Sequence, residues 1–146
     1  MSDTKKKYKI GYTQGAFDMF HIGHLNLIRN AKAQCEKLVV GVNSDELIEK
    51  YKKKTPIICE TDRVDIISAL KYVDRTVLVS DLDKGVIYNE IPFDAIFIGD
   101  DWKGNQRWIE TEQQLNKLGA EVVYLKYTEG ISSTMLREIS PKKKEK

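Results

Sequence analysis

The two histidines of this chain, His21 and His24, lie three residues apart in one tetrapeptide. They follow a glycine-containing segment, residues 15–18, and a short apolar run, so we expect them where a first strand turns into a first helix. At a helix start the backbone N–H groups and the helix dipole favour an anion, and Gly23 lets a ligand approach the backbone closely. This spacing and position favour a phosphate-binding site over two incidental histidines.

A second polar segment, residues 128–134, offers similar chemistry far along the chain. Gly130 allows a tight turn there. Ser132, Ser133 and Thr134 place hydroxyl groups and backbone amides at an expected helix start, which is another site suited to an anion. Alone, this segment would be an ordinary serine-capped helix. Together with the two histidines, it predicts a site for a nucleoside triphosphate.

Apolar, β-branched runs alternate with amphipathic stretches along the chain. We expect five strands, at residues 9–13, 38–42, 76–79, 95–99 and 122–125. We expect helices at residues 22–33, 44–51, 62–70, 107–118 and 133–139. This alternation predicts an α/β fold, a single doubly wound, Rossmann-like domain with a central parallel five-stranded sheet.

Ligands of such sheets bind beyond the carboxyl ends of the strands. The polar, glycine-bearing segments follow directly after expected strands, at residues 15–24, 43–44, 99–101 and 128–130. We therefore expect them to meet at one edge of the sheet, with the histidines and the serine-rich segment facing the same triphosphate.

The composition fits one soluble domain over residues 1–146, with 41% hydrophobic residues, a net charge of +2 and frayed basic tails at residues 1–6 and 141–146. The basic runs lack interleaved aromatic residues on one face, which argues against a nucleic-acid partner. No run approaches the roughly 20 apolar residues of a membrane span, and the N-terminus lacks an apolar signal core. We therefore expect a cytoplasmic protein without membrane insertion.

The cysteines indicate neither a disulfide framework nor a metal site. Cys35 and Cys59 lack metal-ligand spacing, so we expect two reduced thiols. Because both histidines belong to one tetrapeptide, a structural zinc site is not expected. We predict no metal held by the protein alone.

Residues 15–24 resemble the GxFDxxHxGH signature of the nucleotidyltransferase superfamily that adenylylates or cytidylylates phosphorylated alcohols. Residues 128–134 resemble the RTEGIST motif of its cytidylyltransferase branch, with Tyr127 in place of the arginine. Residues 99–104, GDDWKG, resemble the GDDWxG stretch of the glycerol-3-phosphate cytidylyltransferases. The signature is matched at all of its fixed positions, Gly15, Phe17, Asp18, His21, Gly23 and His24.

This resemblance, which runs from about Lys7 to Ile139, implies three groups of site residues. The implied catalytic residues are His21, His24 and Lys52, the last chosen by its spacing back from Arg63. Nucleotide contacts besides the histidines are implied at Gly15, Ala16, Phe17, Lys54, Thr128, Glu129, Gly130, Ile131, Ser132, Ser133 and Thr134. Substrate contacts besides Lys52 are implied at Asp18, Lys84, Asp101 and Trp102.

Several of these residues have equally ordinary explanations. Phe17 is suited to core packing, and Asp18 to fixing the backbone of its own turn. A lysine run such as residues 50–54 is usually a solvated face. Residues 99–104 could be a strand-end turn with a locally packed tryptophan.

The resemblance implies transfer of a cytidylyl group from CTP to a small phosphorylated alcohol, glycerol 3-phosphate first, with release of pyrophosphate. Such products are precursors of cell-surface polysaccharide or teichoic acid. Mg²⁺ would accompany the CTP, with Asp100 and Asp101 available to help hold it. A homodimer is also implied, because Tyr72, Val73 and Asp74 match a family stretch at the subunit contact.

Three alternatives remain open. The acceptor could instead be phosphocholine, phosphoethanolamine or another capsule or teichoic-acid precursor, because Tyr127 and the sequence around Trp102 leave room for one. The nucleotide could be ATP, as in the related adenylyltransferases. The protein could also be an inactive nucleotide-binding regulator, although the intact histidine motif and Lys52 argue against that.

Overall fold

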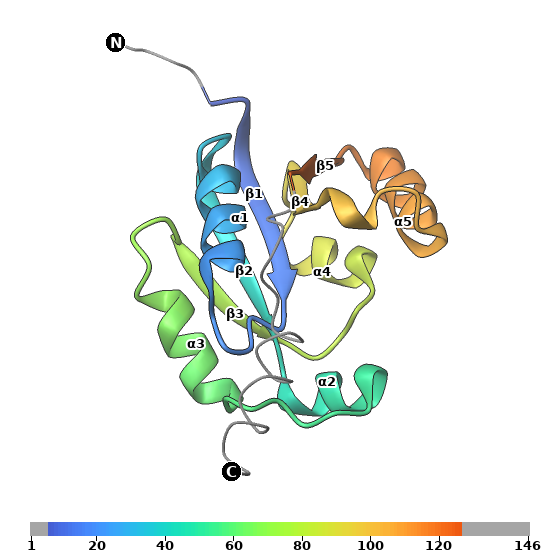
Figure 1. The fold of residues 1–146 in the computed structure, drawn as a ribbon. Helices are drawn as coiled ribbons and strands as arrows, with labels where there is room; N and C mark the ends of the chain where they lie inside the picture. The colour runs from blue at the N-terminus through green and yellow to red at the C-terminus, as the bar shows by residue number, and fades with distance from the viewer. Residues whose placement is uncertain (1–5, 127–146) are drawn as a thin grey trace, which may run out of the picture.

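The structure is a computed structural model that describes residues 6–126 of the chain. Its centre is a five-stranded sheet whose neighbouring strands all run parallel, in the order β3-β2-β1-β4-β5 (Figure 1). The strands are β1 (Tyr8–Gly15), β2 (Cys35–Asn43), β3 (Arg75–Val79), β4 (Ala95–Gly99) and β5 (Glu121–Leu125). Each coincides with a predicted run, so the α/β class and the parallel five-stranded sheet are confirmed.

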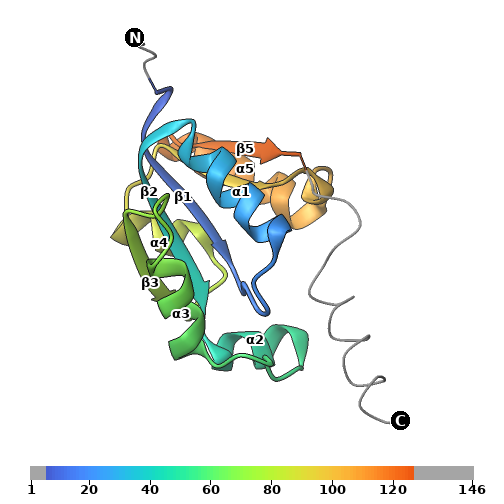
Figure 2. The ribbon, with the colours of Figure 1, turned by 60° about the vertical axis from the view of Figure 1, so that its left-hand side comes forward.

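The helices cover both faces of this sheet. One face carries α1 (Ile22–Lys32) and α3 (Glu60–Ser68), and the other carries α4 (Lys84–Glu90) and α5 (Gln106–Leu118). A further helix, α2 (Asp45–Lys52), lies beyond the carboxyl ends of β1 and β2 in both views (Figures 1 and 2). A short 3₁₀ turn, η1 (Asp100–Trp102), follows β4.

Alternation along the strands divides the buried side chains between two cores. On β2, Leu38 and Val40 belong to the core beneath α1 and α3, whereas Val39 between them belongs to the core beneath α4 and α5. Successive side chains of a strand point to opposite faces. A strand covered on both faces therefore needs apolar residues throughout, which is why these runs are visible in the sequence.

Four of the expected helices are present, as α1, α2, α3 and α5, and one helix was missed. The missed helix, α4, has seven residues with Gly85 at its second position, so it offers little periodic pattern. It is stabilised by the Asp83 side chain, which accepts a hydrogen bond from the Gly85 N–H, and by Ile87 in the second core. The helix expected at residues 133–139 lies outside the described residues.

Within residues 6–126, no helix has the length and hydropathy needed to cross a membrane.

Candidate active site

The turn between β1 and α1 carries the first predicted motif, and its backbone is unusual. Phe17 and Met19 have φ values of 53° and 51°, in the left-handed region that non-glycine residues rarely adopt. Between them, the 5% exposed Asp18 accepts hydrogen bonds from the backbone N–H groups of Ile57 and Ile58, each at 2.9 Å. Asp18 thus ties this turn to the loop after α2, and its predicted substrate contact stays a prediction.

The two histidines form the N-terminal cap of α1. The Nδ1 atom of His21 accepts a hydrogen bond from the Gly23 N–H at 3.0 Å. The Nδ1 atom of His24 accepts one from the His21 N–H at 3.2 Å, which completes a capping box. An imidazole nitrogen that accepts carries no proton, so each neutral ring bears its proton on Nε2. Capping thus fixes which nitrogen of each ring is a donor.

The imidazole rings are stacked, with centroids 3.9 Å apart and an interplanar angle of 24°. Phe17, 4% exposed, and Phe20 both pack against His24, each with its ring centroid 5.4 Å from that of His24. Phe17 therefore does pack in the core, while its predicted nucleotide contact is untested. The aromatic side chains hold His24 in one orientation.

Burial keeps both imidazoles neutral. It lowers the pKa of His24 to about 3, and the adjacent His21 and the charge of Lys52 act in the same direction, against Asp18. Burial also lowers the pKa of His21. At neutral pH the pair therefore offers neutral N–H donors rather than two positive charges.

Arg63 joins the segments around this motif, and sequence reasoning missed this role. Its guanidinium, 1% exposed, donates to the backbone carbonyls of Ala16 at 2.7 Å, Asn43 at 2.8 Å and Ile58 at 2.8 Å. It also pairs with the Asp45 carboxylate at 2.5 Å. The sequence signal that could have revealed this role is the spacing of Arg63, four residues before the apolar Ile67. This spacing places both side chains on the inner face of α3.

A chain of polar side chains runs along the carboxyl edge of the sheet. The Tyr12 hydroxyl donates to Gln14 at 2.6 Å, and the Gln14 amide donates to the Asn43 side chain at 2.9 Å. The Asn43 amide in turn donates to the Tyr51 hydroxyl at 3.1 Å. These bonds position α2 relative to β1 and β2.

The predicted lysines differ in their surroundings. Lys52 is the last residue of α2, and its positive charge acts on His24, so the structure brings these two predicted catalytic residues into one region. Lys53 ends the helix in the left-handed conformation with φ of 57°. Lys54 follows in an exposed loop, where its predicted nucleotide contact is untested.

The remaining predicted substrate residues follow β3 and β4. Lys84 begins α4 and is 7% exposed, with its Nζ atom 5.4 Å from the centroid of the Trp108 ring. Burial, with the nearby Asp100, raises the pKa of Asp101. Trp102 in η1 is 41% exposed. All three therefore follow the carboxyl ends of strands, as was expected for Asp101, and their contacts with substrate remain predictions.

The second motif lies outside the described residues, from Tyr127 through Thr128, Glu129, Gly130, Ile131, Ser132, Ser133 and Thr134. Its convergence with the histidines stays a prediction. Among residues 6–126, no group of three or more histidine, cysteine, aspartate or glutamate side chains is placed to hold a metal ion. The Mg²⁺ expected to accompany the nucleotide stays a prediction.

Comparison with known proteins assigns this chain to a family. The chain matches the model of the cytidylyltransferase-like family over residues 12–139. It is 32% identical to the bifunctional protein HldE of Nitrobacter hamburgensis over 129 residues, which are 88% of this chain and 26% of that protein. For HldE of Paramagnetospirillum magneticum the identity is 30% over 131 residues, covering 89% and 26%. The chain thus spans about a quarter of the length of these relatives.

Solved structures with the same fold are also known. The crystal structure of a lipopolysaccharide core biosynthesis protein from Thermoplasma volcanium has a TM-score of 0.70 and 31% identity, covering 85% of this chain and 99% of that one. A protein of unknown function from Archaeoglobus fulgidus, 15% identical with a TM-score of 0.57, covers 85% and 93% and shares the fold alone.

Neutral imidazole donors at a helix start, placed where parallel strands end, are an arrangement suited to phosphate groups in an α/β protein. The class is that of the nucleotidyltransferases. Within it, this chain belongs to the cytidylyltransferase-like family, as its match over residues 12–139 shows. The narrower resemblance to glycerol-3-phosphate cytidylyltransferase is not resolved by these relatives and stays a prediction.

Proposed function

We propose that this protein transfers a cytidylyl group from CTP to a small phosphorylated alcohol, glycerol 3-phosphate in the first instance, and releases pyrophosphate. The observation that carries the proposal is the stacked pair His21 and His24. Their Nδ1 atoms are occupied by the helix cap, so the Nε2–H groups serve the phosphates.

The chain's own residues act by placement and charge. His21 and His24 hold the triphosphate on its leaving-group side, and the segment around Ser132 is proposed to hold it from the other side. An oxygen of the acceptor phosphate attacks the α-phosphorus and forms a new P–O bond. The bond between the α-phosphorus and the bridging oxygen breaks, and the electron pair leaves with pyrophosphate.

No general base is required in this step, because a phosphomonoester is already ionised near neutral pH. Lys52 neutralises charge on the attacked phosphate, since an ammonium group on a flexible stem can follow a moving phosphoryl group. The neutral histidines donate hydrogen bonds and transfer no proton. Catalysis is therefore electrostatic and positional.

A second candidate is adenylyl transfer from ATP to a sugar phosphate. The relatives are compatible with it, because neither the name HldE nor the description "lipopolysaccharide core biosynthesis protein" specifies cytidine or glycerol. A lipopolysaccharide core contains sugars, so a sugar phosphate joins the acceptors to be tested. Both candidates use the same imidazole pair.

The test is a matrix of CTP and ATP against glycerol 3-phosphate, phosphocholine, phosphoethanolamine and sugar 1-phosphates, read by pyrophosphate release with Mg²⁺. We expect CTP with glycerol 3-phosphate to give the highest kcat/KM. A preference for ATP with a sugar phosphate would establish the second candidate. Tight nucleotide binding without pyrophosphate release for any acceptor would overturn both and favour a regulator.

A further inference from the structure

Lys84 is a buried cation. It is 7% exposed, and its ammonium group donates to the Leu82 carbonyl at 2.7 Å. Within residues 6–126, no carboxylate forms an ion pair with it, although Asp81 and Asp83 act on it from a distance. Buried lysines are rare unless paired. An ammonium group in this position is suited to an anion supplied by a ligand.

Arg107 places a second positive charge beside the first. It lies in the first turn of α5, where the helix dipole disfavours a cation, and it too has no carboxylate partner in the described part of the chain. Its guanidinium carbon is 5.6 Å from the centroid of the Trp102 ring. Burial is the main cause that lowers the pKa of Lys84, and the charge of Arg107 lowers it further. Arg107 also directly precedes Trp108, whose ring lies next to the Lys84 ammonium, so the two cations act on one region and favour an anion there.

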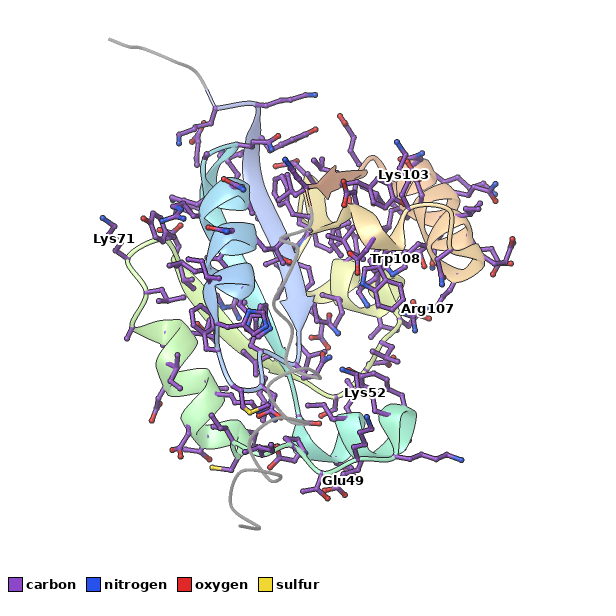
Figure 3. The ribbon with its side chains drawn as sticks, in the orientation of Figure 1. Glu49, Lys52, Lys71, Lys103, Arg107 and Trp108 are labelled. Carbon is purple, nitrogen blue, oxygen red and sulfur yellow. The ribbon has the colours of Figure 1, made fainter. Side chains whose placement is uncertain are left out.

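This pair lies across the sheet from the histidines. His21 and His24 begin α1, which covers the first face, whereas Lys84 and Arg107 begin α4 and α5, which cover the second. In Figure 3, Arg107 and Trp108 extend from the start of α5 on the side toward α2, where Lys52 lies. All of these groups belong to the carboxyl edge of the sheet, but they reach it from opposite faces.

The arrangement matches what an in-line displacement needs. The attacking oxygen must enter opposite the leaving oxygen on the α-phosphorus. If the histidines hold the pyrophosphate side, the acceptor must approach from the other face, where α4 and α5 begin. That face is the one that presents Lys84 and Arg107.

We infer that Arg107 joins Lys84, which the resemblance already implies as a substrate contact, in binding the phosphate group of the acceptor. This inference rests on the proposed function and adds Arg107 as a substrate-binding residue that the sequence motifs do not include. The ligand is a phosphomonoester dianion, which a guanidinium can grip with two parallel hydrogen bonds and an ammonium with one more. The Lys84 ammonium packs on the Trp108 ring and the Arg107 guanidinium on the Trp102 ring.

The chain supplies its own probe for this subsite, because Trp102 and Trp108 are its two tryptophans. Titration of the protein with glycerol 3-phosphate and with inorganic phosphate should change the intrinsic fluorescence saturably, whereas glycerol should not. Absence of any saturable change with either phosphate would overturn the inference. This measurement needs no turnover, so it separates the subsite from the proposed reaction.

The decisive variant is Arg107→Met, and Lys103→Met is its matched control. Both residues are exposed cations next to aromatic rings near the start of α5, and Lys103 lies over Tyr124, with its Nζ atom 5.9 Å from the ring centroid. Arg107→Met should weaken glycerol 3-phosphate binding about tenfold or more, the loss expected for one charge-assisted contact. Lys103→Met should change it less than twofold, and Arg107→Lys should recover part of the loss.

Kinetics give a second readout once turnover is established. Arg107→Met should raise the KM for the acceptor and leave the KM for the nucleotide within twofold. An equal rise in both, or a rise confined to the nucleotide, would assign Arg107 to the triphosphate and overturn the inference. Equal losses of acceptor binding in Arg107→Met and Lys103→Met would show that net charge alone causes the effect. That result would also overturn the inference.

Discussion

At the scale of single residues, each histidine serves two purposes with its two nitrogens. Nδ1 of His21 and Nδ1 of His24 cap α1, which commits the opposite nitrogens to donation. Stability and chemistry can therefore be separated by substitution. Glutamine at the third helical position completes a capping box without an imidazole.

We expect His24→Gln to retain the fold and lose activity. Turnover should fall on the order of 10²–10³, by analogy with the loss of one oxyanion donor. The free energy of unfolding should remain within about 1 kcal/mol of wild type because the cap is kept, whereas His24→Ala should lose both. Pyrophosphate release and urea denaturation measure the two effects. Near wild-type turnover in His24→Gln would remove His24 from the mechanism.

The low pKa of His24 predicts a pH-dependent stability. The folded protein keeps this ring neutral to about pH 3, whereas the unfolded chain binds its proton near pH 6.5. The free energy of unfolding therefore falls as the pH drops below 6.5, because the unfolded chain gains a proton that the folded protein does not bind. Above pH 6.5 this loss of stability is absent. Between pH 7 and pH 5 we expect wild type to lose about 2 kcal/mol more than His24→Gln. Parallel losses in the two proteins would contradict this assignment.

At the scale of elements, α3 positions the site although it contributes no residue to the predicted chemistry. Arg63 joins the turn after β1, the end of β2 and the start of α2 through Ala16, Asn43 and Asp45. Asp18 adds two bonds from the same turn to residues 57–58. The histidine turn and the helix that carries Lys52 are therefore fixed to one another.

Arg63→Met should destabilise the protein by about 3 kcal/mol or more, because the buried carbonyls and Asp45 lose their donor. Arg63→Lys should recover little, since an ammonium group cannot match the fork of a guanidinium. Arg75→Met, at an exposed position on β3, is the control and should stay within about 0.5 kcal/mol. Thermal and urea unfolding measure these changes, and equal losses at both positions would contradict the role given to Arg63.

At the scale of the whole molecule, the homodimer remains a prediction. The stretch implied at the subunit contact also serves the monomer, because Asp74 accepts hydrogen bonds from the Leu38 N–H at 2.8 Å and from Lys32 at 2.7 Å. Tyr72 and Val73 pack against the first core. These residues therefore have a role within one chain, and sequence resemblance alone does not assign them to an interface.

We expect sedimentation velocity to give twice the chain mass of 16.8 kDa. A single species at 16.8 kDa over the micromolar range would contradict the dimer. Lys71→Glu, at an exposed position beside this stretch, should weaken the dimer if the contact lies there. The exposed Glu46→Lys on α2 is the control.

The five strands, four of the helices and the histidine turn could be predicted from the sequence alone. These features are local: a strand buried on both faces must be apolar throughout, and a helix start with two imidazoles can be recognised within ten residues. The short helix α4 was not predicted, because tertiary packing stabilises it and its sequence has little periodic pattern.

The contacts of Arg63 and Arg107 could be recognised only from the folded structure. Each looks like an ordinary surface charge in the sequence, and each has its partner far along the chain: Ala16 for Arg63, and Lys84 for Arg107. For Lys84, which the resemblance implies as a substrate contact, the structure adds its burial and its place over the Trp108 ring. Burial and the pairing of charges depend on which segments meet in space. A linear pattern records the residue types but not which of them come together, which is why the contacts of Arg63 and Arg107 could be recognised only in three dimensions.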